Sequence, residues 1–443
     1  MRNVLFLLIF VQTAFGFTAK NSTEAKLTFS YFVQIHQKEQ PDEDRAKAVI
    51  DDQLDYLYGT MAADKRYAVP RGEHTIQVTD IHEGEEEGVW EADYDYSGLI
   101  QVKKGPRTRY TVALPRDPSE EGIYDPGLNE GGNENLCTDE HYNSYVDYWY
   151  FWNPDQDGCS LREGEDFDRV QGAIERQPNT KESYPEYPRL AHKNADGARE
   201  ILVYAFFGMD DENHVKDPIR GRDINAATYR KFRKGLIEMG FDELQRMEKE
   251  EINRILQGKH YRRPFVEVAR KWTPKGNLKV VLFFGPTGIN ERSGAFHYFY
   301  KEANEKAAIM LYDGHSGLGG HLDLKAIETL NRFSLKQNPN RYQIFFFNSC
   351  TSYSYYNTVY FYRKAPRSVR LRTKSLDILT NGLATEFDGM APVDLELIKA
   401  VDDWSFGGKV RSYQALSRVM DTHNLFGVNG DQDNPTSPEE LTE

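Results

Sequence analysis

Five short apolar runs between residues 199 and 380 constrain the fold of this chain more than any other feature. They cover residues 201–207, 278–284, 307–312, 342–347 and 376–380. Strands that are buried on both faces of a sheet are continuously apolar in this way. Helix-length segments separate several of the runs, at 229–239, 295–305 and 322–335. The alternation predicts an α/β domain in three αβα layers, with a mainly parallel sheet covered by helices.

The preceding part of the chain has a different texture. Apolar residues alternate over residues 27–36, as in a half-buried strand, and recur at helical spacing over 46–58, after the acidic Asp42, Glu43 and Asp44. Strand-like stretches fill 75–114, with expected breaks at Gly98 and at 104–106. We therefore expect a small α+β domain over 17–115, a linker over 116–197, the α/β domain over 198–428, and a polar tail over 429–443.

The first 16 residues have the composition of an export signal. Arg2 precedes an apolar run over 4–11, and small residues follow at 14 and 16. This run is too short to cross a bilayer, and the later apolar runs are shorter still. The formal net charge of −14 disfavours nucleic acid as a partner. The sequence thus predicts a secreted or periplasmic protein without a transmembrane segment, and it makes no prediction of oligomeric state.

Three cysteines in an exported protein leave one thiol unpaired. Cys137 and Cys159 bracket a short aromatic segment that ends in turn-forming residues, and we expect them to form a disulfide. A closed loop of about 20 residues contributes roughly 3 kcal/mol of stability in the chain-entropy description. Cys350 is then the free cysteine, which suggests either a chemical use or an inert buried thiol.

Two of the apolar runs end in residues that can perform chemistry. The run 307–312 is followed by Asp313-Gly314-His315-Ser316-Gly317, and the run 342–347 by Asn348-Ser349-Cys350. One helix-length connection separates the two runs, so the strands can be parallel neighbours about 4.8 Å apart. His315 and Cys350 would then face one cleft at the carboxyl end of the sheet. A thiol nucleophile needs such a neighbouring base, which takes its proton and returns it to the leaving amine.

These two motifs and their order resemble the caspase, gingipain and legumain superfamily of cysteine peptidases. The resemblance extends over residues 198–428 in the order of strands and helices, and only the two short motifs are specific. It implies that Cys350 is the nucleophile, that His315 is the general acid/base, and that the N–H groups of Ser316 and Cys350 form the oxyanion hole. Asp313, Gly314, Gly317, Asn348 and Ser349 would shape the site. Ser316 stands where family members usually have glycine, and only a backbone N–H is required there.

The resemblance implies a cysteine endopeptidase that acts on a protein or peptide substrate and needs no cofactor or metal. The alternative is a catalytically inactive member of the same fold that acts as a binding or surface-interaction module. Asp313-Gly314-His315 also resembles a turn of metal-dependent phosphatases, with Gly430–Asn434 as further acidic ligands. That turn should come early in its domain and be followed by more spaced aspartates, which disfavours the phosphatase hypothesis. The N-terminal domain is expected to be either a pro-segment or a binding module.

Overall fold

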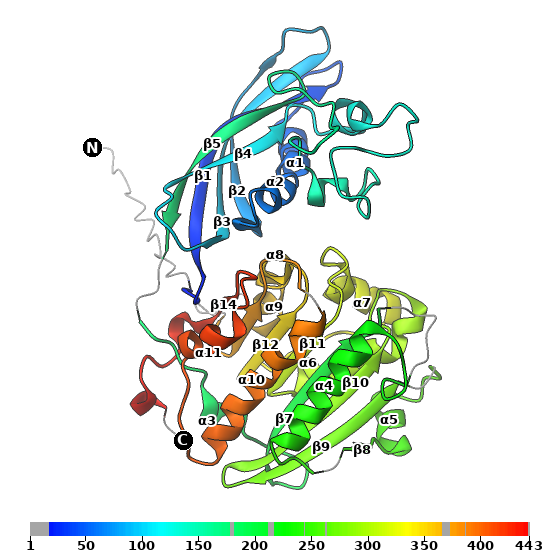
Figure 1. Cartoon of the computed structure of the whole chain (residues 1–443), viewed down its shortest axis with the longest axis vertical. Coiled ribbons are helices and arrows are strands. Elements are labelled where there is room, and N and C mark those ends of the chain that lie inside the picture. The colour runs from blue at the N-terminus through cyan, green and yellow to red at the C-terminus, as the bar shows by residue number, and fades with distance from the viewer. Residues whose placement is uncertain are drawn as a thin grey trace, which may run out of the picture.

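The alternating apolar residues near the N-terminus form strand β1 (Ser22–His36), which lies at the centre of the first of two sheets. The computed structural model describes residues 17–177, 181–210, 217–242, 244–261, 264–365, 373–385 and 387–441 (Figure 1). The expected export signal at 1–16 lies outside these residues. The first sheet is antiparallel, in the order β2-β3-β1-β5-β4, with β2 (Ala68–Glu83), β3 (Val89–Lys103), β4 (Arg109–Pro115) and β5 (Phe167–Arg176).

Strand β5 corrects the expected domain boundary. It lies inside the segment 116–197 that the sequence predicts to be a linker, yet it pairs with both β1 and β4. Its buried side chains include Val170 and Ile174, which join the core of the first domain. Gln171 and Ala173 alternate with these buried residues and are exposed, and charged residues at both ends of the strand hide it in the composition. The N-terminal domain therefore extends to Arg176.

Gly98 does not break the strand in which it lies. It is an interior residue of β3, opposite Leu27 of β1 and His74 of β2. A Cβ atom at this position would lie 2.1 Å from the hydroxyl of Tyr96, so that side chain occupies the space above the glycine. An aromatic ring that covers a strand glycine in this way compensates for its missing side chain.

Two short helices replace the single helix that the sequence pattern predicts. They are α1 (Glu43–Leu54) and α2 (Leu57–Ala63), and both bury their apolar residues against the first sheet. Asp42 caps α1 by accepting a hydrogen bond from the N–H of Arg45 at 2.8 Å. The expected acidic first turn is therefore present, and it matches the positive end of the helix dipole.

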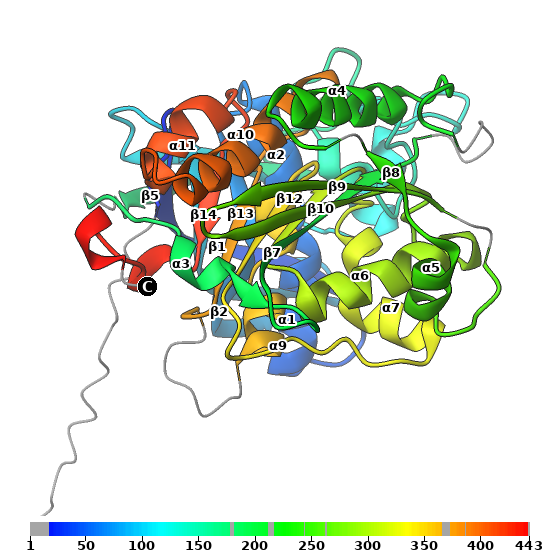
Figure 2. The same cartoon turned by 90° about the horizontal axis from the view of Figure 1, so that it is seen from below.

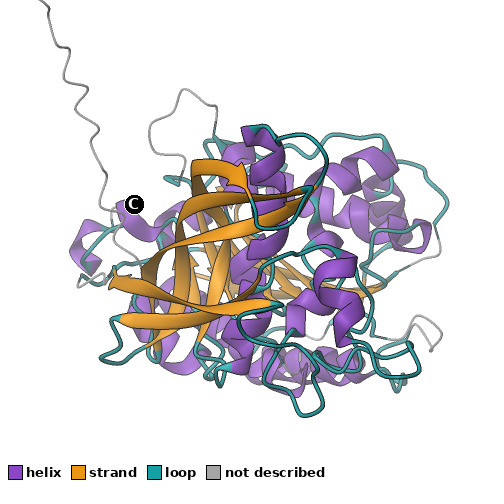
Figure 3. Cartoon of the chain, turned by 90° about the horizontal axis from the view of Figure 1, so that it is seen from above, coloured by secondary structure: helices purple, strands orange, loops and turns teal. Residues whose placement is uncertain are grey.

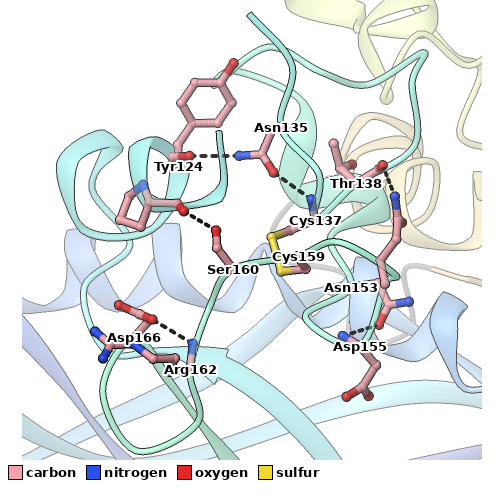
Figure 4. Close-up of a disulfide and its surroundings, with 12 residues drawn as sticks. Tyr124, Asn135, Cys137, Thr138, Asn153, Asp155, Cys159, Ser160, Arg162 and Asp166 are labelled. Carbon is pink, nitrogen blue, oxygen red and sulfur yellow. Dashed lines mark hydrogen bonds between the residues drawn. A yellow bond between two sulfur atoms is a disulfide. The ribbon is translucent and has the colours of Figure 1, made fainter. Parts of the chain in front are cut away.

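The expected disulfide between Cys137 and Cys159 is present, with a Cα–Cα distance of 4.7 Å (Figure 4). Cys137 is fully buried in a small satellite core that also contains Tyr56, Tyr148 and Trp152. The hydroxyl of Tyr56 on the α1–α2 junction is within hydrogen-bond distance of that of Tyr148 in the loop. The disulfide loop therefore packs onto the N-terminal domain as a structured part of it.

The continuous apolar runs form the centre of the second sheet. Strands β13 (Leu376–Thr380), β12 (Gln343–Asn348), β11 (Ile309–Asp313), β7 (Arg199–Gly208) and β10 (Gly276–Gly285) are adjacent in this order and parallel. The sheet is extended by antiparallel strands that the sequence analysis did not identify: β14 (Gly427–Asn429), β9 (Phe265–Thr273), β8 (Gln245–Arg246) and the short β6 (His192–Lys193). This C-terminal domain has the expected mixed α/β architecture with a mainly parallel centre.

Helices cover both faces of the second sheet (Figure 2). On one face lie α4 (Ile224–Glu238), α10 (Phe387–Ser405) and α11 (Tyr413–Met420). On the other lie α5 (Lys249–Ile255), α6 (Gly294–Lys306), α7 (Leu324–Asn331) and α9 (Thr358–Lys364). The short helices α3 (Tyr187–Leu190) and α8 (Ser352–Tyr355) lie at opposite ends of the domain in Figure 1. No helix in the described part of the chain combines the length and apolarity that crossing a bilayer requires.

The segment expected to be a polar tail is partly built into this domain. Asn429 ends β14, and Asp431 and Asn434 are buried. The Asp431 carboxylate accepts a hydrogen bond from Ser183, and Asn434 donates one to Asp377 at 2.6 Å. Partners from distant parts of the chain thus bury polar residues that the composition places in a solvated tail.

The N-terminal domain lies over the carboxyl end of the second sheet (Figures 1 and 3). Phe17 is 2% exposed and packs in the core of the C-terminal domain, with its ring against Phe426. At the interface, Tyr353 donates to the buried carboxylate of Glu24 at 2.7 Å. Arg71 approaches the same carboxylate at 3.4 Å. The two domains therefore share buried contacts and a polar network around Glu24.

Candidate active site at the carboxyl end of the parallel sheet

His315 and Cys350 occupy equivalent positions beyond neighbouring strands. Strands β11 and β12 pair in parallel, and their last paired residues are Asp313 and Asn348. The chain continues for two residues beyond each strand, to His315 after β11 and to Cys350 after β12. Because adjacent strands are about 4.8 Å apart, this register brings both residues to one edge of the sheet. The structure thus places the two predicted residues at one strand-end region.

Asp210 is a third candidate residue of the site, and the sequence analysis did not identify it. Its Oδ1 atom lies 2.7 Å from Nε2 of His315. Asp210 follows the end of β7, the strand that pairs with β11 on the side opposite β12. The available signal was an aspartate just after the apolar run 201–207, but the order of strands was needed to place it beside His315.

Local contacts hold the backbone around His315. Tyr312 donates a hydrogen bond from its buried hydroxyl to the carbonyl of His315 at 2.7 Å. The carbonyl of Ser316 accepts hydrogen bonds from Tyr356 at 3.0 Å and from the N–H of His321 at 3.1 Å. Gly317 has a φ of 55°, which lies in the left-handed region that favours glycine, and it forms the tight turn after His315. The imidazole is therefore presented on a fixed turn, with its side chain 45% exposed.

Cys350 is half-buried and its thiol contacts the loop that follows β13. The N–H of Thr385 lies 3.4 Å from Sγ, within the range of a hydrogen bond to sulfur. Thr351, the next residue, has a φ of 50° and donates its N–H to the carbonyl of Leu383 at 3.2 Å. The hydroxyl of Tyr150, from the disulfide loop, contacts the hydroxyl of Thr351. Segments of both domains thus fix the position of the cysteine.

The predicted oxyanion donors are not used by the protein itself. Within the described residues, the backbone N–H groups of Ser316 and Cys350 have no hydrogen-bond acceptor. Ser316 is 5% exposed, and its neighbours hold it through its carbonyl group. An unpaired N–H beside a reactive group is available to a developing negative charge. Ser316 therefore keeps an unpaired backbone N–H at the position where the sequence analysis predicts an oxyanion donor.

A buried polar network lies beneath the ends of the strands that carry the site. Asn381 donates to the side chain of Asn348 at 2.7 Å, and Asn348 donates to Asp394 of α10 at 2.9 Å. Burial, and secondly the charge of Asp394, raise the pKa of Asp313 well above its usual range. Burial also raises the pKa of Asp394, to about 7. Burial thus favours the protonated forms of both carboxyls, which lie beneath the strand ends and do not face the solvent. Gly314 and Ser349, the other predicted shaping residues, adjoin these strand ends.

A pocket with a volume of about 490 Å³ opens beside this edge of the sheet. Asn348 and Thr385 line it from the C-terminal domain, and Lys65 and Lys103 from the N-terminal domain. Among the described residues, eight that are not glycine have positive φ, and six lie in segments around the strand ends or the pocket. These six are Lys65, Arg66, Leu318, Thr351, His423 and Leu425. Such unfavourable backbone conformations often concentrate at functional sites.

One group of described residues could hold a metal ion, and it lies outside this site. Asp80, His82 and Asp93 bring one ligand atom each to within 4.8 Å of the others on strands β2 and β3. No group of three ligands in the described residues includes Asp313 or His315. Asp431, which the phosphatase hypothesis requires as a ligand, instead contacts Ser183. The structure thus offers no assembled metal centre for that hypothesis within the described chain.

Comparisons with known protein families, with curated proteins and with solved structures found no match for this chain.

Proposed function

We propose that this protein is a secreted or periplasmic cysteine endopeptidase with Cys350 as nucleophile and His315 as general acid/base. The observation that carries the proposal is the equal register of these residues beyond β11 and β12, together with Asp210 at 2.7 Å from His315. The disulfide between Cys137 and Cys159 supports an oxidising compartment. The similarity of the two motifs to caspase-like peptidases supports the reaction class.

The contact between His315 and Asp210 supports a division of roles between the two ring nitrogens. Asp210 accepts a hydrogen bond from Nε2–H of His315, and the proposal gives the proton exchange with the thiol to Nδ1. Asp210 thereby selects the tautomer, orients the ring, and stabilises the imidazolium that forms when the thiol loses its proton. This arrangement makes Asp210 a positioning residue, since it acts through His315.

The proposed reaction has two steps. The Cys350 thiolate attacks the substrate carbonyl carbon, and the N–H groups of Ser316 and Cys350 stabilise the resulting oxyanion. The C–N bond breaks, the amine leaves with a proton from His315, and a thioester remains on the enzyme. His315 then takes a proton from water, whose oxygen attacks the thioester and releases the carboxylic acid and the thiol. The overall reaction consumes one water for each peptide bond.

The decisive experiment compares cleavage of a diverse peptide library by wild-type protein and by Cys350→Ala. Cleavage by wild type alone would support the proposal. If neither wild-type protein nor Cys350→Ala cleaves any peptide, and thiol labelling is also absent, the inactive binding module is favoured.

Iodoacetamide supplies that second measurement, because Cys350 is the free cysteine in the oxidised protein. We expect one label per chain in wild type, none in Cys350→Ala, and slower labelling in His315→Ala. Labelling that does not depend on His315 would contradict the proposed dyad.

A further inference from the structure

The pocket beside Cys350 has walls from both domains. Its described lining includes Asn348, Leu383, Thr385, Met390 and Val393 of the C-terminal domain. Lys65, Arg66 and Lys103 line it from the N-terminal domain. We refer to these three residues as the cationic wall. The floor is thus neutral and partly apolar, and the positive charge comes from the other domain.

One contact and one connection along the chain link this pocket to the candidate nucleophile. Thr385, a lining residue, places its N–H 3.4 Å from Sγ of Cys350. Asn348, another lining residue, precedes Cys350 by two positions at the end of β12. A substrate group that fills the pocket would therefore lie next to the bond that Cys350 attacks.

The charges of the cationic wall are not neutralised within the described structure. Lys65 and Arg66 are exposed and Lys103 is half-buried. None of the three forms an ion pair with a described carboxylate, and no acidic residue is among the described residues that line the pocket. The chain as a whole carries a net charge of −14, so this local excess of positive charge runs against its composition.

A second pocket, in the N-terminal domain, differs in how its basic residues are paired. It also holds three basic residues, Arg107, Arg109 and Arg169. There, Arg107 pairs with Asp64 at 2.6 Å and Arg169 pairs with Asp155 at 2.6 Å, and both acids line the same pocket. Two of these three charges are thus used in the protein's own ion pairs, whereas no residue of the cationic wall has an ion-pair partner among the described residues.

The cationic wall is held in place by backbone contacts. Lys103 donates from Nζ to the carbonyl of Lys65 at 2.7 Å, and its N–H bonds the carbonyl of Tyr67 at 2.9 Å. Lys65 and Arg66 follow the end of α2 with φ values of 53° and 54°. The turn that carries two of the cations is therefore tied to the strand that carries the third. A preorganised charge binds its partner more tightly, because less ordering is required on binding.

We propose that this pocket recognises an anionic group of the substrate next to the scissile bond, and that the N-terminal domain is its specificity-determining part. The shared chemistry is an oxyanion, which an acidic side chain or a phosphorylated side chain can supply. This inference rests on the proposed peptidase function. It also explains why the N-terminal domain is fixed to the C-terminal domain, since a removable pro-segment would take the cationic wall with it.

The first test measures kcat/KM on peptides that differ at one position beside the scissile bond: aspartate, glutamate, phosphoserine, alanine or lysine. We expect the anionic peptides to be cleaved at least tenfold faster than the lysine peptide, because like charges in a pocket oppose binding. Faster cleavage of the aspartate and glutamate peptides would identify an acidic side chain as the anion, and faster cleavage of the phosphoserine peptide would identify a phosphorylated one. Equal cleavage of all five would overturn the inference and leave the peptidase proposal standing.

The matched variants separate the cationic wall from general charge. Lys65→Gln/Arg66→Gln/Lys103→Gln should lose most of the preference for the anionic peptides over the alanine peptide. The control, Lys26→Gln/Lys38→Gln/Arg45→Gln, removes three exposed charges of the same domain that do not line the pocket. A control variant that loses the same preference would contradict the inference. If the triple variant does not fold, Arg66→Gln alone gives the same test at an exposed position.

A second test does not require turnover. Anionic iodoacetate and neutral iodoacetamide both alkylate Cys350, and the ratio of their rates reports the local charge. We expect this ratio to fall at least fivefold from wild type to the cationic-wall variant, and the difference to shrink in 0.5 M salt, where screening is strong. An unchanged ratio would refute the inference even if no peptide is cleaved. A changed ratio without peptide cleavage would support a cationic pocket beside a reactive Cys350 and would overturn its assignment to a peptide substrate.

Discussion

The disulfide offers a prediction that links stability to the candidate site. Replacing both Cys137 and Cys159 by serine opens a loop with a sequence separation of 22 residues. In the chain-entropy description, a loop of this length contributes about 3 kcal/mol to the free energy of unfolding. Cys137 is also fully buried beside Tyr148 and Trp152, so a serine hydroxyl would have to be accommodated in an apolar cluster. The entropic value is therefore a lower bound for the loss.

Urea unfolding monitored by tryptophan fluorescence measures this loss. Trp149 and Trp152 lie in the loop itself and Trp90 lies in the first sheet, so the N-terminal domain has its own probes. With a urea dependence of about 2 kcal/mol per molar, the double variant should unfold at a urea concentration about 1.5 M lower. Cys350→Ser is the control, because that thiol lies outside the disulfide, and its midpoint should stay within about 0.3 M of wild type.

The same variant should also change the reactivity of Cys350. Tyr150 in the loop contacts Thr351, the residue that follows the cysteine. Loosening the loop removes this restraint, and we expect the rate of iodoacetamide labelling to change at least threefold in the folded variant. A double variant that matches wild type in both midpoint and labelling rate would refute the argument that the loop is a structural part of the domain and the site.

Three further predictions concern single side chains. Burial raises the pKa of Asp377 to about 8, so the native state keeps a proton that the unfolded chain loses above about pH 4. The contribution of Asp377 to the free energy of unfolding is therefore fully present at low pH and declines by up to about 1.4 kcal/mol per pH unit as the pH rises towards 8. Asp377→Asn should flatten the pH dependence of the urea midpoint between about pH 5 and 8. Tyr353→Phe removes the donor to Glu24 and should cost about 1–2 kcal/mol in urea unfolding. Asp210→Asn removes the charge beside His315, and iodoacetamide labelling of Cys350 at neutral pH should slow at least threefold; an unchanged rate would contradict the positioning role of Asp210.

Features with a local physical cause could be predicted from the amino-acid sequence. Continuous apolar runs predict strands buried on both faces, and all five runs became neighbouring parallel strands. Because polar residues that follow such strands must emerge at one edge, the positions of His315 and Cys350 could be assigned without coordinates. The pairing of Cys137 with Cys159 was similarly accessible, because the spacing and turn residues left one plausible partner for each.

The tertiary structure decided what depends on pairing between distant segments. Strand β5 was hidden, because its pattern of buried and exposed residues has meaning only beside β1 and β4. Asp210 was hidden for the same reason, since only the placement of β7 next to β11 brings it to His315. The cationic wall is separated from Cys350 by more than 240 residues of chain, and the packing of one domain on the other places it at the pocket. The periodicity of apolar residues along the sequence carries no information on such contacts, because their free energy comes from packing between segments that are distant in the chain.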